Sequence, residues 1–142
     1  MTLFSPKTKV GAINHIGIAT TDIEASLKQY CELFDAPRAE IIRSVEHGLR
    51  AAFIEKGETH IELLEPLRPD TAIGRFVERH GEGIHHMAFT VDDIDRKAKE
   101  LMDLGIPIID GPREGLRGRI AFSHPSATHG VLIEIVCPPD GH

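Results

Sequence analysis

The fold is decided by the stretch Ile13-Asn14-His15-Ile16-Gly17, which recurs 71 residues later, from position 13 to position 84, as Ile84-His85-His86-Met87-Ala88. The repeat continues further along both halves, where Asp22-Ile23-Glu24 aligns with Asp93-Ile94-Asp95, and Ile61-Glu62-Leu63 aligns with Ile133-Glu134-Ile135. Each copy therefore carries a histidine near its beginning and a glutamate near its end. Two such copies could bring four ligand-type side chains together, so the repeat predicts a metal site.

Strand periodicity sharpens the choice of ligands. Side chains of a strand alternate between its two faces, so His15 shares a face with the small residues Gly17 and Ala19. On the equivalent strand His86 occupies the matching position, and His85 is expected to point to the opposite face. Small neighbours leave room for a ligand, which favours His15 and His86 as the histidine pair.

The two repeat-matched glutamates are the other candidates. Glu62 and Glu134 each interrupt an apolar strand, and a half-buried carboxylate is costly unless it is paired or bound to a metal. The ligand set predicted from the residues is therefore His15, Glu62, His86 and Glu134.

The same order of elements is expected in both halves, one helix after the first strand and then three strands. Thr21 and Glu24 fit a capping box at the first helix, and Asp92 fits the N-cap of the second. Gly105 fits the end of that second helix. The expected strands are 13–19, 40–46, 50–55, 59–65, 85–91, 106–110, 118–123 and 131–136, and the expected helices end near Leu33 and Leu104, with a connector helix over about 70–80.

Length and charge limit the class of protein. The chain has 142 residues, which predicts one compact domain, and a net charge of −6, which argues against nucleic acid as the main partner. The two cysteines, the lack of a long apolar run and the polar start predict a reduced, cytoplasmic protein without a membrane span. Arg113, Arg117 and Arg119 crowd one stretch and could meet an anionic group.

With these residues and this order of elements, the chain resembles the vicinal oxygen chelate superfamily, and within it the methylmalonyl-CoA epimerases. The resemblance spans about residues 11–138 and is carried by segments 13–19, 61–67, 81–89, 91–94 and 130–134 with His124-Pro125. It implies an α+β fold: two tandem βαβββ modules, about 11–67 and 84–138, forming a cupped mixed sheet around a metal site, with the helices on the outer face. It also implies the same four ligands.

The resemblance further implies an activity. It points to metal-dependent interconversion of 2R- and 2S-methylmalonyl-CoA through an enolate, with a CoA thioester as substrate, a homodimeric protein and a divalent ion, Co²⁺ first, then Mn²⁺, Ni²⁺ or Zn²⁺. Glu134 is the expected base, and Glu62 and Glu46 are candidates for the opposite base. Some relatives have a second glutamate where this chain has Ala51, so the opposite base and the acyl group stay open.

Three other functions fit the same scaffold. A lyase resembling glyoxalase I would also move a proton beside a metal, and an epimerase of another 2-substituted malonyl-CoA would differ only in its acyl pocket. A ring-cleaving dioxygenase normally has three protein ligands, so a fourth at Glu62 argues against it. A binding module without activity would not need the ligand set that this chain carries.

Overall fold

The computed structural model describes residues 8–139 and contains the expected order of elements, β-α-β-β-β, a connector helix, and β-α-β-β-β again. Its elements are β1 (Val10–Ala19), α1 (Ile23–Phe34), β2 (Ile41–Ser44), β3 (Leu49–Lys56), β4 (Thr59–Pro66), α2 (Ala72–His80), β5 (Gly83–Val91), α3 (Ile94–Asp103), β6 (Ile108–Gly115), β7 (Gly118–Ser123), a short 3₁₀ helix (Pro125–Thr128) and β8 (Ile133–Cys137). The strands form a mixed sheet in the order β2-β3-β4-β1-β5-β8-β7-β6. The expected α+β class with two βαβββ modules is confirmed.

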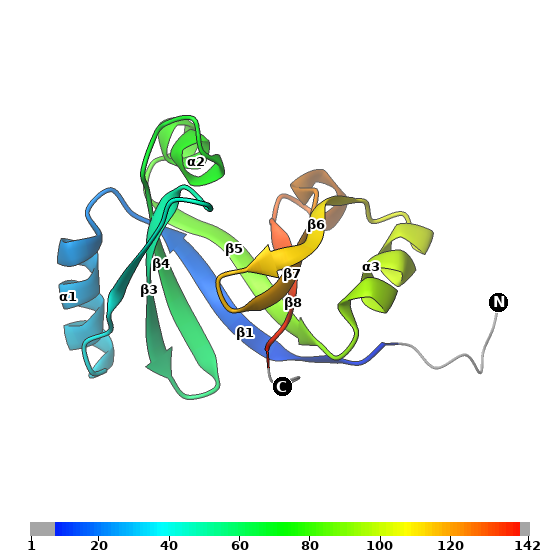
Figure 1. Cartoon of the computed structure of the whole chain (residues 1–142), viewed down its shortest axis with the longest axis horizontal. Coiled ribbons are helices and arrows are strands. Elements are labelled where there is room, and N and C mark those ends of the chain that lie inside the picture. Colours follow the sequence, from blue (N-terminus) through cyan, green and yellow to red (C-terminus); the bar gives the residue numbers. More distant parts are fainter. Residues whose placement is uncertain (1–7, 140–142) are drawn as a thin grey trace. The chain divides into compact units, whose positions relative to one another are not determined.

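One compact unit comprises residues 15–86. In it β1 runs parallel to β4, and β4, β3 and β2 are antiparallel neighbours. Helix α1 packs on one face of these strands through Ile23, Leu27 and Cys31, which contact Ala52, Ile54 and Leu63 (Figure 1). Because alternate residues face opposite ways, Glu62 and Phe53 lie on the face that α1 does not cover.

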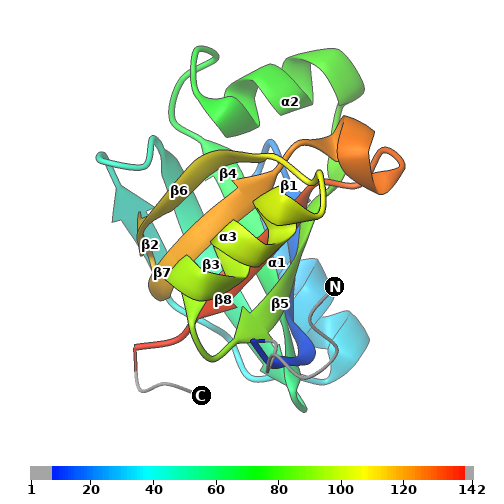
Figure 2. The ribbon, with the colours of Figure 1, turned by 90° about the vertical axis from the view of Figure 1, so that its right-hand side faces the viewer.

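The other compact unit comprises residues 1–14 and 87–142, of which 8–14 and 87–139 are described. Here β5 runs parallel to β8, followed by antiparallel β7 and β6. Helix α3 packs through Ile94 and Ala98 on a cluster with Val91, Ala121 and Ile135, and Figure 2 shows α3 in front of β7 and β8. The expectation of a single domain over 11–138 stays a prediction.

Both main helices begin one residue later than the sequence predicts. Asp22 and not Thr21 is the N-cap of α1, and its side chain accepts a hydrogen bond from Ala25 N. In the same way Asp93 and not Asp92 caps α3 by accepting from Arg96 N. The capping-box expectation is wrong because the Thr21 hydroxyl donates to Glu82 instead. Gly105 follows α3 with a φ of +84°, the left-handed conformation expected there.

Glu82 holds the start of β5 beside the end of β1. Its carboxylate accepts hydrogen bonds from Thr21 N, from the Thr20 hydroxyl and from the Thr21 hydroxyl, at 2.9–3.1 Å. These bonds, led by the Thr21 backbone N–H, lower the pKa of Glu82. The contact joins Thr21 to Glu82, 61 residues later in the sequence. It fixes the start of β5, the strand that carries His86, beside the end of β1.

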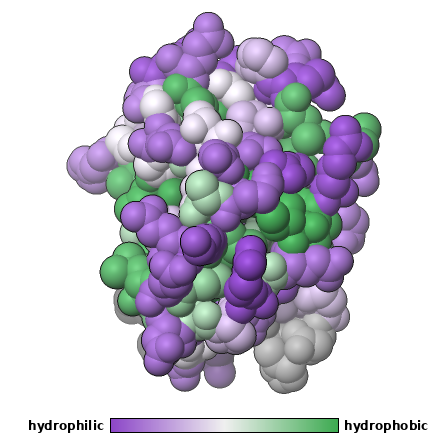
Figure 3. Space-filling view, turned by 90° about the vertical axis from the view of Figure 1, so that its left-hand side faces the viewer, coloured by the Kyte–Doolittle hydropathy of each residue, from purple (hydrophilic) through white to green (hydrophobic). Residues whose placement is uncertain are grey.

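The surface of the unit formed by residues 15–86 mixes apolar and polar side chains. In Figure 3 apolar patches lie between polar ones on the face that is seen there, and Leu33, Ile42 and Val45 are among the exposed large apolar residues. Within residues 8–139, no helix combines the length and the apolar character that crossing a membrane takes.

Candidate metal centre

Three of the four predicted ligands lie together in the unit formed by residues 15–86. His15 on β1, Glu62 on β4 and His86 on β5 offer ligand atoms that all lie within 4.8 Å of one another. His15 Nε2 is 3.0 Å from His86 Nε2, and Glu62 Oε1 is 3.8 Å from His15 Nε2 and 3.6 Å from His86 Nε2. The side chains are buried, with residue exposures of 7%, 8% and 3% respectively. Residues far apart in the sequence therefore converge through their Nε2 and Oε1 atoms.

Strand register places these side chains. Residue Gly17 of β1 pairs with Glu62, and His15 pairs with His60 two residues earlier on β4. Glu62 therefore lies beside Gly17 on the neighbouring strand. His15, two residues before Gly17, points to the same face of β1. Glu62 is buried between the apolar positions 61 and 63, which is the arrangement that the sequence suggested.

Gly17 creates the space that the His86 ring occupies. A methyl group at position 17 would overlap the His86 imidazole, whose Nε2 would be only 2.7 Å from it. The small residue beside His15 was expected to leave room for a ligand; in the structure it leaves room for the second histidine. The two rings meet edge to face, with centroids 5.1 Å apart and planes at 89°.

His86 is held in its neutral form. Burial lowers the pKa of His86 well below its usual value, and the charges of His15 and His85 lower it further. A neutral imidazole has a free lone pair on one ring nitrogen, and this is the form that binds a metal ion. The electrostatics of the pocket therefore favour a ligating histidine over a cationic one.

His85 is closer to the site than the sequence predicts. Strand alternation was expected to separate it from His86, yet its Nδ1 lies 3.0 Å from His86 Nδ1. Its ring packs edge to face on Phe76 of α2, with centroids 4.9 Å apart, and burial lowers the pKa of His85 to about 4. Strand alternation does not predict this contact between the two rings.

The other candidate residues lie at different places. Glu134 is buried on β8, with 3% exposure, and pairs with Ala88 of β5 and Phe122 of β7. His60, beside His15, is half-buried. Ala51 is completely buried on β3, so this position offers no carboxylate.

The donor set fits a divalent ion. Ligands about 2.0–2.2 Å from a metal, at angles between octahedral and tetrahedral, stand roughly 3.0–3.5 Å from one another. The 3.0 Å between the two Nε2 atoms meets this condition, and the Glu62 distances of 3.6 and 3.8 Å are slightly longer. Two imidazoles and a carboxylate also supply the nitrogen and oxygen donors that first-row divalent metals accept. The residues present can therefore hold such an ion.

The arginine-rich stretch is largely engaged with carboxylates. Arg113 donates to both oxygens of Asp110 at 2.8 and 2.9 Å, and Arg119 donates to both oxygens of Asp95 at 2.7 and 3.2 Å. Each guanidinium is therefore already neutralised by a fork-like pair. This arrangement gives no support to a phosphate clamp built from Arg113 and Arg119.

Comparison with known proteins places these residues in a family. The model of the Glyoxalase/Bleomycin resistance protein/Dioxygenase superfamily matches residues 14–122. The chain is 36% identical over 132 residues to the mitochondrial methylmalonyl-CoA epimerase of Dictyostelium discoideum. The alignment covers 91% of this chain and 80% of that protein. It is 33% identical to the ethylmalonyl-CoA/methylmalonyl-CoA epimerase of Cereibacter sphaeroides, over 89% of this chain and 97% of that protein.

A solved structure agrees with these relatives. A variant of Streptomyces coelicolor methylmalonyl-CoA epimerase, in complex with 2-nitronate-propionyl-CoA, is 37% identical to this chain and superimposes with a TM-score of 0.84. The match covers 90% of this chain and 97% of that one. The chain therefore belongs to the glyoxalase/bleomycin resistance protein/dioxygenase superfamily and, within it, to the family of the methylmalonyl-CoA epimerases.

Proposed function

We propose that this protein is a metal-dependent epimerase that interconverts the 2R and 2S forms of methylmalonyl-CoA. The observation that carries the proposal is the buried cluster of His15, Glu62 and His86 in a chain that matches methylmalonyl-CoA epimerases over about nine-tenths of its length. The relative crystallised with a CoA thioester analogue supports a CoA thioester as the substrate class. A homodimeric state and a cytoplasmic location stay predictions.

The proposed ligand set adds Glu134 to the three clustered residues. Glu134 is the repeat partner of Glu62, and its carboxylate is almost completely buried. It pairs in register with Ala88 of β5, as Glu62 pairs with Gly17 of β1. A carboxylate oxygen is also a donor that first-row divalent ions accept beside imidazole nitrogens.

The donor types accept Co²⁺, Mn²⁺, Ni²⁺ and Zn²⁺, and Co²⁺ is the ion that we propose first. When bound, such an ion supplies Lewis-acid stabilisation for the negative charge that develops on the thioester oxygen. His15, His86 and Glu62 would hold it from three different strands, so that its position does not depend on a mobile loop.

The reaction itself is a proton exchange at C2 of the substrate. A carboxylate, proposed to be Glu134, removes the C2 proton from one face, and the electron pair left on C2 delocalises into the thioester carbonyl as an enolate. A proton delivered to the opposite face then re-forms the C–H bond with inverted configuration. No bond other than C2–H breaks, and no redox partner is consumed.

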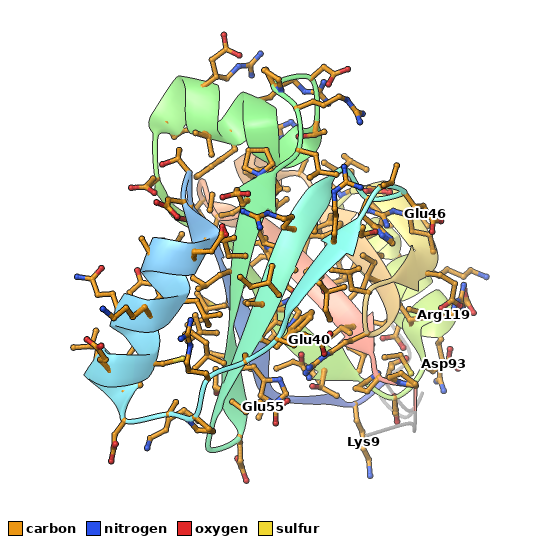
Figure 4. The ribbon with its side chains drawn as sticks, turned by 60° about the vertical axis from the view of Figure 1, so that its left-hand side comes forward. Lys9, Glu40, Glu46, Glu55, Asp93 and Arg119 are labelled. Atoms are coloured by element: carbon orange, nitrogen blue, oxygen red, sulfur yellow. The ribbon has the colours of Figure 1, made fainter. Side chains whose placement is uncertain are left out.

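The opposite face needs a second proton carrier. Glu62 is the better of the two candidates, because it lies within the cluster. Glu46 is exposed on the turn between β2 and β3, and Figure 4 shows it at that turn, away from Glu55 near the other end of β3. Glu62 pairs with Phe53, and the four residues from Phe53 to Leu49 separate it from this turn by about 13 Å along the strand.

A related substrate is the second candidate. The Cereibacter sphaeroides relative is named for both ethylmalonyl-CoA and methylmalonyl-CoA, which supports ethylmalonyl-CoA as a second substrate to test. A glyoxalase I-like lyase is the third candidate, since its chemistry also moves a proton beside a metal, but none of the relatives named above carries that activity.

Proton NMR in deuterated water tests the proposal. The purified, Co²⁺-loaded protein is mixed with (2R)- or (2S)-methylmalonyl-CoA, and the C2 proton signal is followed. Loss of that signal, with conversion between the two forms, is the expected result. Turnover of the methylglyoxal–glutathione adduct with no exchange at C2 would contradict the epimerase and favour the lyase. Ethylmalonyl-CoA, run in parallel, decides the acyl preference.

A further inference from the structure

The second ring nitrogen of His86 is in contact with the residue that precedes it. His85 Nδ1 lies 3.0 Å from His86 Nδ1, while His86 Nε2 lies 3.0 Å from His15 Nε2 and 3.6 Å from Glu62 Oε1. The two nitrogens of one imidazole thus point to two different partners. Nε2 belongs to the proposed metal centre, and Nδ1 belongs to His85.

The protons on these nitrogens are coupled. A hydrogen bond between two imidazole nitrogens takes one N–H and one lone pair. If His86 is to bind a cation through Nε2, its single proton resides on Nδ1, and His85 Nδ1 must then accept it. If His85 Nδ1 carried the proton instead, the proton of His86 would sit on Nε2 and would block ligation.

Packing keeps His85 in place for this role. Its ring stands perpendicular to the His86 ring, with centroids 5.2 Å apart, and its other contact is the edge-to-face packing on Phe76. Phe76 comes from α2, where it also stacks on His80 at 4.9 Å. Gly17 permits a close approach of β1 to the His86 ring. His86 is therefore packed against a glycine and lies in contact with a hydrogen-bond acceptor.

We infer that His85 is a positioning residue for the metal ligand His86: its Nδ1 accepts the Nδ1 proton of His86 and so keeps the His86 Nε2 lone pair directed at the metal centre. Such partners of ligating histidines commonly fix both the tautomer and the orientation of the ring. The inference rests on the proposed function in that it takes the cluster as a metal site.

Three variants test this role. His85→Leu removes the acceptor, and His85→Asn places a carbonyl oxygen near the position of Nδ1. His47→Leu, on the turn between β2 and β3, is the matched control that removes an imidazole outside the cluster. Titration calorimetry measures the Kd for Co²⁺ of each variant and of the wild type, and thermal unfolding confirms that each is folded. We expect His85→Leu to raise the Kd about 10–100-fold, and the other two to stay near the wild-type value.

A spectroscopic measurement on the wild-type protein tests the same role without depending on the folding of a variant or on bound metal. Long-range ¹H–¹⁵N correlation spectra of metal-free wild-type protein report the tautomer of His86, and we expect the proton on Nδ1. A proton on Nε2, an unchanged Kd in His85→Leu, or a loss in His85→Asn as large as in His85→Leu would each overturn the inference. A wild-type protein that binds no Co²⁺ would instead overturn the metal centre of the proposed function, and with it this role.

Discussion

Glu134 and Glu62 are both assigned to the metal centre, but their proposed roles differ. Gln retains an oxygen that can bind a metal, whereas it cannot accept a proton at neutral pH. We therefore expect Glu134→Gln to keep its metal and to lose turnover by at least ~10²-fold, the lower range for a positioned general base. Glu62→Gln should be the milder change for C2 proton exchange, because ligation persists and Glu134 still removes the proton, whereas inversion, which needs the opposite proton carrier, should slow. Metal content by elemental analysis and exchange of the C2 proton measure the two effects separately.

The reverse order would change the assignment. A Glu62→Gln protein without activity, beside an active Glu134→Gln protein, would make Glu62 the principal base. Ala51 gives this outcome a physical basis, since the buried alanine leaves β3 without a carboxylate at that position.

Gly17 gives a second prediction for a single residue. A methyl group there would overlap the His86 ring, so Gly17→Ala must displace His86 from the cluster or strain β1. We expect a loss of about 1–3 kcal/mol in stability from overpacking and roughly a 10²-fold loss of turnover from the displaced ligand. Chemical denaturation and the proton-exchange assay measure these.

Gly11→Ala is the matched control on the same strand. A methyl group at position 11 would meet only Thr90, at an ordinary distance of 3.7 Å. We expect near-normal turnover in Gly11→Ala. An equal loss of turnover in both variants would show that β1 tolerates no added methyl group and that the effect is not specific to His86.

The residues of the cluster could be predicted because each half of the sequence carries one histidine and one glutamate at matching positions. His15, Glu62 and His86 were selected from the repeat and from strand alternation, and the structure brings these three together. The role of His85 could not be seen in this way, because alternation describes the direction of a Cβ and not the reach of an imidazole ring. Adjacent side chains can still touch where one ring turns toward the other, as the 3.0 Å contact between the two Nδ1 atoms shows.

Among the elements, helix α3 is joined to the chain that precedes β1. The Glu100 carboxylate accepts hydrogen bonds from Thr8 N at 2.9 Å and from the Thr8 hydroxyl at 3.1 Å, and pairs with Lys97 at 2.9 Å. The Thr8 backbone bond, followed by Lys97, lowers the pKa of Glu100 from 4.5 to about 2. Its stabilisation is therefore complete above pH 4.5 and is lost as the pH falls toward 2.

Glu100→Gln should show this pH dependence directly. We expect a lower melting temperature than that of the wild type at pH 7, and a difference that shrinks as the pH falls from 5 toward 2. Glu58→Gln, an exposed change on the turn between β3 and β4, is the control and should leave the melting curves together. A Glu100→Gln difference that does not vary with pH would assign the effect to packing and not to the charge.

Element boundaries show where local patterns are enough and where they are not. The caps at Asp22 and Asp93 lie within one residue of the expected positions, because helix starts depend on side chains three residues away. The error at Thr21 arises from Glu82, which is distant in the sequence and binds both Thr20 and Thr21. Contacts of this kind follow from the packed chain and have no signature in a local window.

At the scale of the whole molecule, the pairing of strands follows the repeat, as their order does. Each half contains a parallel pair, β1 with β4 and β5 with β8, separated by a helix and a hairpin. The final glutamate of each half lies on the strand that is parallel to the histidine strand. This shared topology explains why an offset of 71 residues, from position 15 to position 86, relates the two histidines proposed as ligands.

The metal should also stabilise the folded chain, which gives a prediction that does not depend on turnover. An ion that binds only the native state at 100 times its Kd adds about 2.7 kcal/mol to stability. For a chain of this size that corresponds to a rise of roughly 10 °C in melting temperature. We expect protein treated with chelator to lose C2 exchange and this rise, and about one equivalent of Co²⁺ or Mn²⁺ to restore both.

The His15→Ala and His86→Ala variants connect that effect to the cluster. Each removes one of the two nitrogen donors that lie 3.0 Å apart, so Co²⁺ should no longer raise the melting temperature of either variant. His47→Ala, a half-buried histidine change on the turn between β2 and β3, should respond as the wild type does. Full exchange activity in protein shown by elemental analysis to be free of metal would contradict a metal-centred reaction, because the buried carboxylates and imidazoles would then have to stabilise the enolate alone.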